Sequence, residues 1–200
     1  MQSLAAFILL MGLAALPARS ADAPARKVLF ICTGNFFRSA FAEHYFNFLA
    51  TQNRRLEPGD PRRKRVVWVA ESRGLDLAQL SPTQRAARMS AFAVERLKQL
   101  KVPLPMAGTL PAHTPTVLTV SDLEKSDRVI ALHDPTHRPM LRRFMERHGA
   151  RGPDPLLDRV IYWNIQDVIR SPVIPLTPAQ QAARALDEVQ RAVEQLFASL

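Results

Sequence analysis

The sequence contains the stretch Val28-Leu29-Phe30-Ile31-Cys32-Thr33-Gly34-Asn35-Phe36-Phe37-Arg38-Ser39, which predicts both the fold of the chain and the place of its functional site. A β-prone apolar run leads into the only cysteine of the chain, and an arginine follows six residues later. Gly34 and Asn35 tolerate the left-handed backbone angles of a tight loop. A loop of this length between a strand and a helix aims backbone N–H groups and a guanidinium at one oxyanion. The stretch therefore predicts a phosphate-binding loop.

Cys32 is expected to lie beneath the bound phosphoryl group, where the arginine and the helix N-terminus stabilise its thiolate. Phosphoryl transfer needs an in-line nucleophile, compensation for the charge on the equatorial oxygens, and a proton for the leaving oxygen. Cys32 meets the first need, and the loop amides with Arg38 meet the second. No metal ion or other cofactor is required for this chemistry. The alternative interpretation is a buried free cysteine followed by an unrelated surface arginine.

Residues 28–46, VLFICTGNFFRSAFAEHYF, resemble the active-site segment of the low-molecular-weight protein tyrosine phosphatases, whose loop reads C-x-G-N-x-C-R-S-P. The positions that match are Cys32, Gly34, Asn35, Arg38 and Ser39. The resemblance implies that Cys32 is the nucleophile and Arg38 the phosphate clamp. It also implies loop-shaping hydrogen bonds for Asn35 and a hydroxyl donor to the thiolate for Ser39. The substrate-binding set includes the loop residues Thr33, Gly34, Asn35, Phe36, Phe37 and Ser39.

The loop departs from the family pattern at two positions, because Phe37 replaces the usual second cysteine and Ala40 the usual proline. Without the second cysteine, no neighbouring thiol can capture an oxidised Cys32 as a reversible disulfide. Phe36 and Phe37 are expected either to wall the pocket for an aromatic leaving group or to pack onto the next helix. A thioredoxin-coupled arsenate reductase needs further cysteines, which this chain does not contain.

The resemblance continues more loosely beyond the loop. Residues 66–75, VVWVAESRGL, resemble the family's second strand and turn, with Ser72 at the position that supports the phosphate loop, and residues 126–132 resemble its third strand. The family's general acid is an aspartate in an Asp-Pro-aromatic motif near the C-terminal end. Asp167 follows the last expected strand but precedes Val168 rather than proline, whereas Asp154 keeps its proline, Pro155. Asp167 is preferred because its place after the strand lets it face the loop, and Asp154 remains the alternative.

Strands are expected at residues 27–31, 65–70, 128–131 and 159–162, and helices at residues 39–51, 90–100, 135–147 and 178–198. Ser39 is expected to open the first helix as its cap, and Thr177 followed by Pro178 to open the last. This alternation predicts an α/β protein with a three-layer, doubly wound fold and a mainly four-stranded parallel sheet. Ligands bind such sheets at the carboxyl ends of the strands, where Cys32 and Asp167 both fall.

Residues 4–16 form an uninterrupted apolar stretch that ends at Pro17 and precedes small residues. The stretch predicts a bacterial secretory signal peptide at residues 1–20, and hence a periplasmic or secreted protein with one domain at residues 21–200. An uncleaved leader that anchors the protein in a membrane is the alternative. After cleavage no membrane-spanning segment is expected, because the rest of the chain has no apolar stretch of about twenty residues.

The formal net charge of +9 indicates anionic partners. The densest basic run, Arg62 to Arg65, has no recognition helix or aromatic platform around it, so nucleic-acid binding is not expected and a solvated loop is preferred. His133 and His137 have a metal-like spacing but no third ligand, and no metal site is expected. The predicted function is therefore hydrolysis of a phosphotyrosine protein or a small aryl phosphate. The alternatives are a catalytically weak phosphate- or phosphoprotein-binding module and an arsenate-handling relative.

Overall fold

The computed structural model describes residues 25–56, 67–150, 152–168 and 175–200. The expected leader and the basic run at residues 62–65 lie outside these ranges. Within them, no helix is long and apolar enough to cross a membrane. These ranges include the strand, loop and helix around Cys32.

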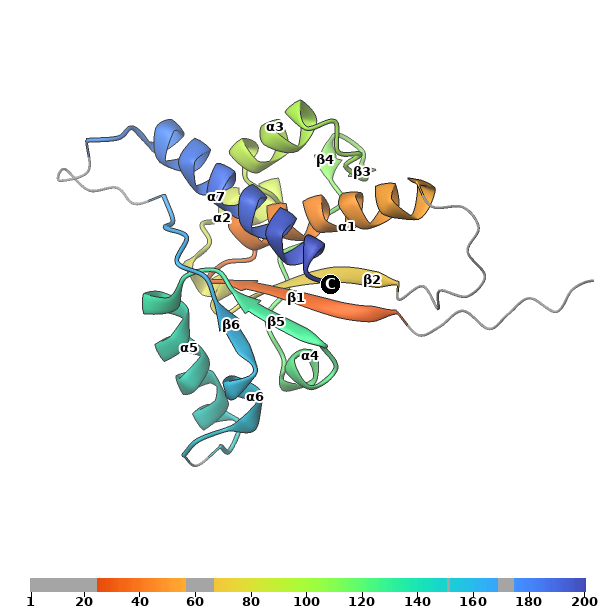
Figure 1. Cartoon of the computed structure of the whole chain (residues 1–200). Helices are drawn as coiled ribbons and strands as arrows, with labels where there is room; N and C mark the ends of the chain where they lie inside the picture. Colours follow the sequence, from red (N-terminus) through yellow and green to blue (C-terminus); the bar gives the residue numbers. More distant parts are fainter. Residues whose placement is uncertain (1–24, 57–66, 151, 169–174) are drawn as a thin grey trace, which may run out of the picture.

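A four-stranded parallel sheet forms the centre of the molecule (Figure 1). Its spatial order is β2, β1, β5 and β6, with β1 at Arg26–Cys32, β2 at Trp68–Gly74, β5 at Arg128–Ala131 and β6 at Val160–Tyr162. Strand β2 pairs with one edge of β1, and β5 pairs with the other edge. The direction in which strands are added to the sheet therefore reverses beside β1. In doubly wound sheets this reversal opens a crevice at the carboxyl ends of the strands.

The second strand lies further along the chain than the sequence predicted. The expected strand at residues 65–70 was wrong in its position, since β2 runs through Glu71, Ser72 and Arg73 to Gly74. The pairing with β1 explains the shift, because the register joins Phe30 to Ser72 and Cys32 to Gly74. Polar residues of low strand propensity are thus held in the sheet by a long-range partner.

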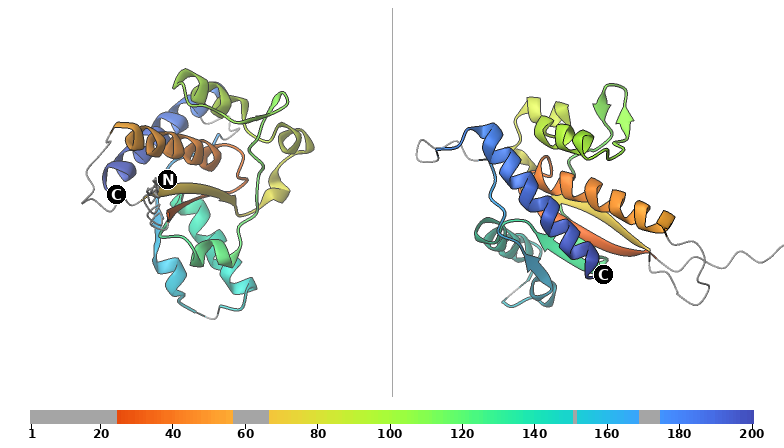
Figure 2. Two further views of the ribbon diagram at one scale, coloured as in Figure 1. Left: turned by 90° about the vertical axis from the view of Figure 1, so that its right-hand side faces the viewer. Right: turned by 45° about the horizontal axis from the view of Figure 1, so that its top comes forward.

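Helices cover both faces of the sheet (Figures 1 and 2). One face carries α1 at Arg38–Leu56, α3 at Ala91–Gln99 and α7 at Pro178–Ala198. The other face carries α4 at Val120–Glu124, α5 at Asp134–Arg147 and α6 at Pro155–Asp158. A short 3₁₀ turn at Leu77–Gln79 and α2 at Pro82–Ala87 follow β2, and a small antiparallel hairpin pairs β3 at Met106–Ala107 with β4 at Leu110–Pro111. The three-layer fold predicted from the sequence is confirmed.

The core has two parts, one on each side of the sheet. Val28, Phe30 and Cys32 point into the cluster under α1 and α7, while Leu29 and Ile31 point into the cluster under α4 and α5. Strand β1 is therefore buried on both faces, as its continuous apolar sequence predicted. Helix α7 begins at a capping box in which the Thr177 hydroxyl accepts a hydrogen bond from the Gln180 N–H. The packed core on both sides of β1 supports the loop at the end of this strand.

Candidate active site

The loop between β1 and α1 closes around the sulfur of Cys32, a side chain that is 3% exposed. The backbone N–H of Asn35 donates to the sulfur at 3.2 Å, and the Ser39 hydroxyl oxygen lies 2.9 Å from it. Asn35 has a φ of 50°, a left-handed angle that asparagine tolerates better than most residues. The tight turn is what brings these two groups to the sulfur.

The side chain of Asn35 is fully hydrogen-bonded. Its amide nitrogen donates to the hydroxyl oxygens of Ser39, at 3.1 Å, and Ser72, at 2.7 Å, and its oxygen accepts from the Thr116 N–H at 2.8 Å. Because the Ser39 oxygen accepts from Asn35, the Ser39 hydroxyl proton is available to the sulfur of Cys32. Ser39 therefore supports the sulfur and does not cap α1, which begins one residue earlier. The expected capping role was wrong, and the close approach of the sulfur is the reason.

A half-buried acid, Glu43, and two histidines lie behind the loop. The Ser72 hydroxyl donates to Glu43 at 2.5 Å, and burial raises the pKa of Glu43 although this hydrogen bond opposes the shift. His113 Nε2 lies 2.9 Å from the Asn35 carbonyl oxygen, which can only accept, so Nε2 carries the proton. Burial lowers the pKa of His113 and brings that of His44, whose ring packs against it, to about 4. Both histidines are therefore neutral at pH 7.

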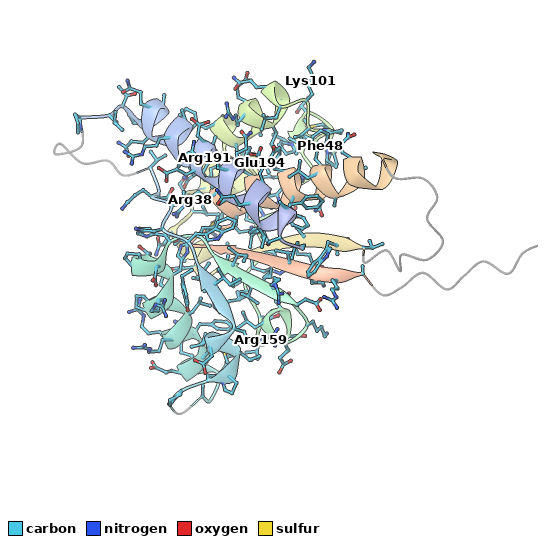
Figure 3. All side chains as sticks on the ribbon, viewed as in Figure 1. Arg38, Phe48, Lys101, Arg159, Arg191 and Glu194 are labelled. Atoms are coloured by element: carbon cyan, nitrogen blue, oxygen red, sulfur yellow. The ribbon has the colours of Figure 1, made fainter. Side chains whose placement is uncertain are left out.

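Arg38 lies at the carboxyl edge of the sheet and is 2% exposed (Figure 3). One terminal nitrogen donates to the Ile165 carbonyl oxygen at 2.7 Å, and the other donates to Asp167 Oδ2 at 2.6 Å. Its Nε is buried and has no hydrogen-bond partner within the described ranges. The guanidinium is thus held by the segment after β6, and its Nε–H is among the donors still available to an oxyanion.

Asp167 faces the loop, and Asp154 does not. The carboxylate of Asp167 accepts from Arg38 and, through Oδ1, from the Val168 N–H at 2.9 Å, while its side chain remains 46% exposed. A proline at position 168 would not have this N–H. Asp154 instead caps α6 by accepting from the Leu156 N–H, and it lines a separate hollow with Arg138 and other residues of α5 and α6.

A cleft of about 430 Å³ opens over the loop. Its residues come from the loop and the start of α1, the segments after β2 and β6, and the starts of α3 and α7: Cys32, Thr33, Gly34, Phe36, Phe37, Arg38, Gln79, Leu80, Gln84, Ser90, Phe92, Asp167, Val168 and Pro178. Phe36 and Phe37 both line it, and Phe37 also packs against the core under α1. Phe37 therefore both lines the cleft and packs on the core, whereas the expected contact with an aromatic leaving group stays a prediction. Asn35, Ser39 and Ser72 lie beneath this surface.

His133 and His137 lie next to the loop on the side of α5. The buried His137 accepts a hydrogen bond from the His133 N–H at Nδ1, and its Nε2 lies 3.4 Å from the Thr33 hydroxyl oxygen. Burial and the nearby Arg38 lower the pKa of His137 to about 3. Sequence reasoning treated this pair only as a metal spacing and did not anticipate Glu43 or His113 at all. In the described part of the chain, no group of three or more His, Cys, Asp or Glu side chains is placed to hold a metal ion.

No protein-family model matches the chain, and no curated protein matches its sequence. Solved structures do match it. A low-molecular-weight protein tyrosine phosphatase from T. tengcongensis is 22% identical with a TM-score of 0.60, and the match covers 88% of this chain and all of that one. Vibrio vulnificus Wzb in complex with benzylphosphonate is 16% identical with a TM-score of 0.59, and the match covers 88% of this chain and 100% of that one.

A third match is the YwlE arginine phosphatase from Geobacillus stearothermophilus, which is 20% identical with a TM-score of 0.55 over 87% of this chain and 92% of that one. These similarities extend over nearly the whole of each relative, so they concern the entire domain rather than one motif. Together with the sheet order and the strand–loop–helix around Cys32, they lead to one conclusion. The chain has the fold of the low-molecular-weight protein tyrosine phosphatase family.

Proposed function

We propose that this chain is a metal-independent phosphomonoester hydrolase of the protein tyrosine phosphatase type. The observation that carries the proposal is the environment of one sulfur atom: Cys32 lies buried at the end of β1, hydrogen-bonded by the loop, with Arg38 and Asp167 beside the same cleft. The fold shared with cysteine-loop phosphatases supports the proposal. The proposed nucleophile, the cation that compensates the phosphoryl charge and the proposed proton donor thus lie around the same cleft.

In the first step, the phosphoryl oxygens bind the loop N–H groups and the guanidinium of Arg38, including its unpartnered Nε. The Cys32 thiolate attacks phosphorus in line with the leaving oxygen, so an S–P bond forms as the P–O bond breaks. Protonated Asp167 gives its proton to the leaving oxygen. Bound phosphate takes over the Arg38 contact that holds Asp167, which leaves the acid to turn toward the leaving group.

In the second step, water attacks the phosphorus of the cysteinyl phosphate, and Asp167 now accepts a proton from that water. The S–P bond breaks, inorganic phosphate leaves, and Cys32 returns as a thiolate. The Ser39 hydroxyl and the Asn35 N–H stabilise the returning negative charge on sulfur. Arginine suits this cycle better than lysine because its planar fork engages two phosphate oxygens at once.

The cleft favours an aromatic leaving group. Phe36, Phe37, Leu80 and Phe92 give it apolar walls, and its volume lies within the range of about 300–1,000 Å³ that is usual for ligand sites. A phosphotyrosyl protein or a small aryl phosphate is therefore the proposed substrate. The structurally similar proteins include both an arginine phosphatase and a complex with benzylphosphonate.

One observation favours a second candidate, a phosphate-binding module with weak turnover. The Arg38 nitrogen that contacts Asp167 is also a phosphate-binding group, and the Val168 N–H holds the other oxygen of the same carboxylate. If these two contacts persist when phosphate is bound, Asp167 cannot reach the leaving group. Tight vanadate binding without turnover is the result that would favour this candidate.

Hydrolysis of p-nitrophenyl phosphate in the presence of EDTA tests the proposal. We expect turnover by the mature protein, loss of turnover in Cys32→Ser, and a decrease of about 10²-fold or more in kcat for Asp167→Asn. Asp154→Asn is the matched control and should change kcat little. Activity that survives in Cys32→Ser, or that requires a divalent metal, would contradict the proposal.

We also propose that the protein is exported, on the basis of the apolar stretch at residues 4–16 and the small residues after it. Expression of the full chain in a bacterium, followed by fractionation and mass determination, tests this. Export predicts a periplasmic or secreted form with a new N-terminus near residue 20. A full-length product in the cytoplasm contradicts the proposal, and a full-length product in the membrane fraction favours the anchored alternative.

A further inference from the structure

A groove runs between α3 and α7 beside the catalytic cleft. The two helices lie side by side over one face of the sheet (Figures 1 and 2). Each contributes a stripe of side chains at helical spacing, which consists of Phe92, Glu95, Arg96 and Gln99 on α3 and of Ala179, Ala183 and Leu186 on α7. Residues three, four and seven apart share one face of a helix, so the two stripes face each other across a hollow of about 150 Å³.

The groove is continuous with the cleft. Phe92 lines both hollows, and Pro178 lines the cleft while the next residue, Ala179, lines the groove. The Phe92 side chain is 43% exposed, so a ligand in either hollow can contact its ring. Its ring therefore forms a wall common to the phosphate site and the groove.

The dimensions of the groove fit a short piece of peptide chain. Phe92 and Gln99 are seven residues apart on α3, or about 10 Å at the helical rise per residue. An extended chain covers this length with about three residues. The volume is too small for a separate ligand, whose sites usually measure at least about 300 Å³, but an apolar cavity of about 150 Å³ has room for a group as large as benzene.

The lining of the groove is mainly apolar. Leu186 forms its floor, with Ala179, Ala183 and Phe92 around it. Arg96 also lines the groove, where one terminal nitrogen of its guanidinium contacts Asp187 and Gln190 of α7 and its buried Nε has no hydrogen-bond partner within the described ranges. Glu95, on the same helix, accepts from Gln99. An apolar side chain that enters the groove thus contacts mainly carbon atoms, and the charge of Arg96 is paired with Asp187.

We propose that this groove is a subsite for an apolar side chain within about three residues of the phosphorylated residue in a peptide substrate. The inference rests on the proposed phosphatase function and deepens it, because it selects a phosphorylated polypeptide over a free aryl phosphate. Burial of a leucine-sized group contributes to binding in proportion to the apolar area removed from water. Specificity then comes from α3 and α7, while the chemistry stays with the loop.

The test uses phosphotyrosyl peptides with leucine or serine at each position within three residues of the phosphotyrosine. We expect leucine at one position to raise kcat/KM about 10-fold, since partial burial of such a side chain supplies about 1.4 kcal/mol. Ala183→Glu and Ala183→Leu should each abolish this preference, the first with a charge and the second by filling the groove. Hydrolysis of p-nitrophenyl phosphate should be unchanged in both, because Ala183 does not line the cleft.

The matched control is Gln195→Glu, an exposed position further along α7 that should leave the peptide preference intact. Binding of the same fluorescent peptides to Cys32→Ser, measured by anisotropy, tests the groove without turnover. Equal values for leucine and serine at every position would overturn the inference, and so would a preference that persists in both Ala183 variants. Failure to hydrolyse p-nitrophenyl phosphate would count against the phosphatase function alone, because the binding assay still decides whether the groove selects leucine.

Discussion

Replacement of His137 by asparagine should make the stability of the protein less dependent on pH. His137 is buried beside the loop that follows Cys32, and its pKa of about 3 lies far below the ordinary value of 6.5 because burial and Arg38 disfavour the charged ring. The unfolded chain therefore takes up a proton at this histidine near pH 6.5, while the folded chain does not. Folding is favoured at neutral pH, and this advantage is lost as the pH falls from 6.5 toward 3.

The size of the effect follows from the shift. At pH 5 the unfolded state has gained a proton over 1.5 pH units while the folded state remains neutral, which corresponds to about 2 kcal/mol. His44, with a pKa of about 4, contributes a loss of similar size, and His113 and His133 act in the same direction. The charged groups that face His137 are Arg38 and, if protonated, His133. The asparagine variant removes only the part of this pH-dependent stability loss that His137 contributes.

Asparagine keeps an oxygen acceptor for the His133 N–H, so the variant should fold, at a cost of about 1–3 kcal/mol for the lost ring. Urea unfolding followed by circular dichroism at pH 7.5, 6 and 5 gives the free energy of unfolding at each pH. Between pH 7.5 and 5 the variant should lose about 2 kcal/mol less than the wild type. Arg143→Lys, at an exposed position of α5, is the control and should keep the wild-type slope. An unchanged slope in the His137 variant would refute the reasoning.

Three further predictions concern the loop. Asn35→Ala should lower stability by about 2–4 kcal/mol, because it leaves buried hydroxyl and N–H partners unpaired, and urea unfolding measures this; a loss below 1 kcal/mol would contradict it. Gly74→Ala should lower kcat/KM far more than Gly34→Ala does in the p-nitrophenyl phosphate assay. A methyl at position 74 meets the loop backbone at 3.0 Å, whereas one at position 34 meets only the flexible end of Leu80, and equal effects would be inconsistent with this. Arg38→Lys should lower kcat/KM about 10²-fold or more in the same assay, because an ammonium cannot replace the fork that binds two oxygens, and near-normal activity would argue against the clamp.

The sequence predicted the parts of the fold that depend on local signals. The apolar run before Cys32 predicted β1, and the Thr177-Pro178 pair predicted the start of α7 at the residue where it begins. The end of β2 was missed because Ser72 and Arg73 have little strand propensity of their own. Their place in the sheet depends on pairing with β1, which a single sequence does not display.

The candidate site likewise divides into residues that are close in the sequence and residues that meet only in the folded chain. Cys32 and Arg38 are close in the sequence, so their meeting at one cleft was predictable from the length of the loop. Asp167 was preferred from its place after the last strand, and the structure places it against Arg38. Glu43 and His113 had no local signal, because their roles depend on contacts with Ser72 and the Asn35 carbonyl across the fold. Glu43 lies only one turn into α1 and reads in the sequence as an ordinary polar helix residue.

The saturated hydrogen bonding of Asn35 has a thermodynamic consequence for ligand recognition. Because each polar group of this side chain already has a protein partner, the anion does not have to order the turn when it arrives. Little conformational entropy is then lost on association, and a larger part of the gross attraction becomes net affinity. Calorimetric titration with inorganic phosphate or vanadate should accordingly show a small heat-capacity change, as for a rigid receptor rather than one that folds around its guest.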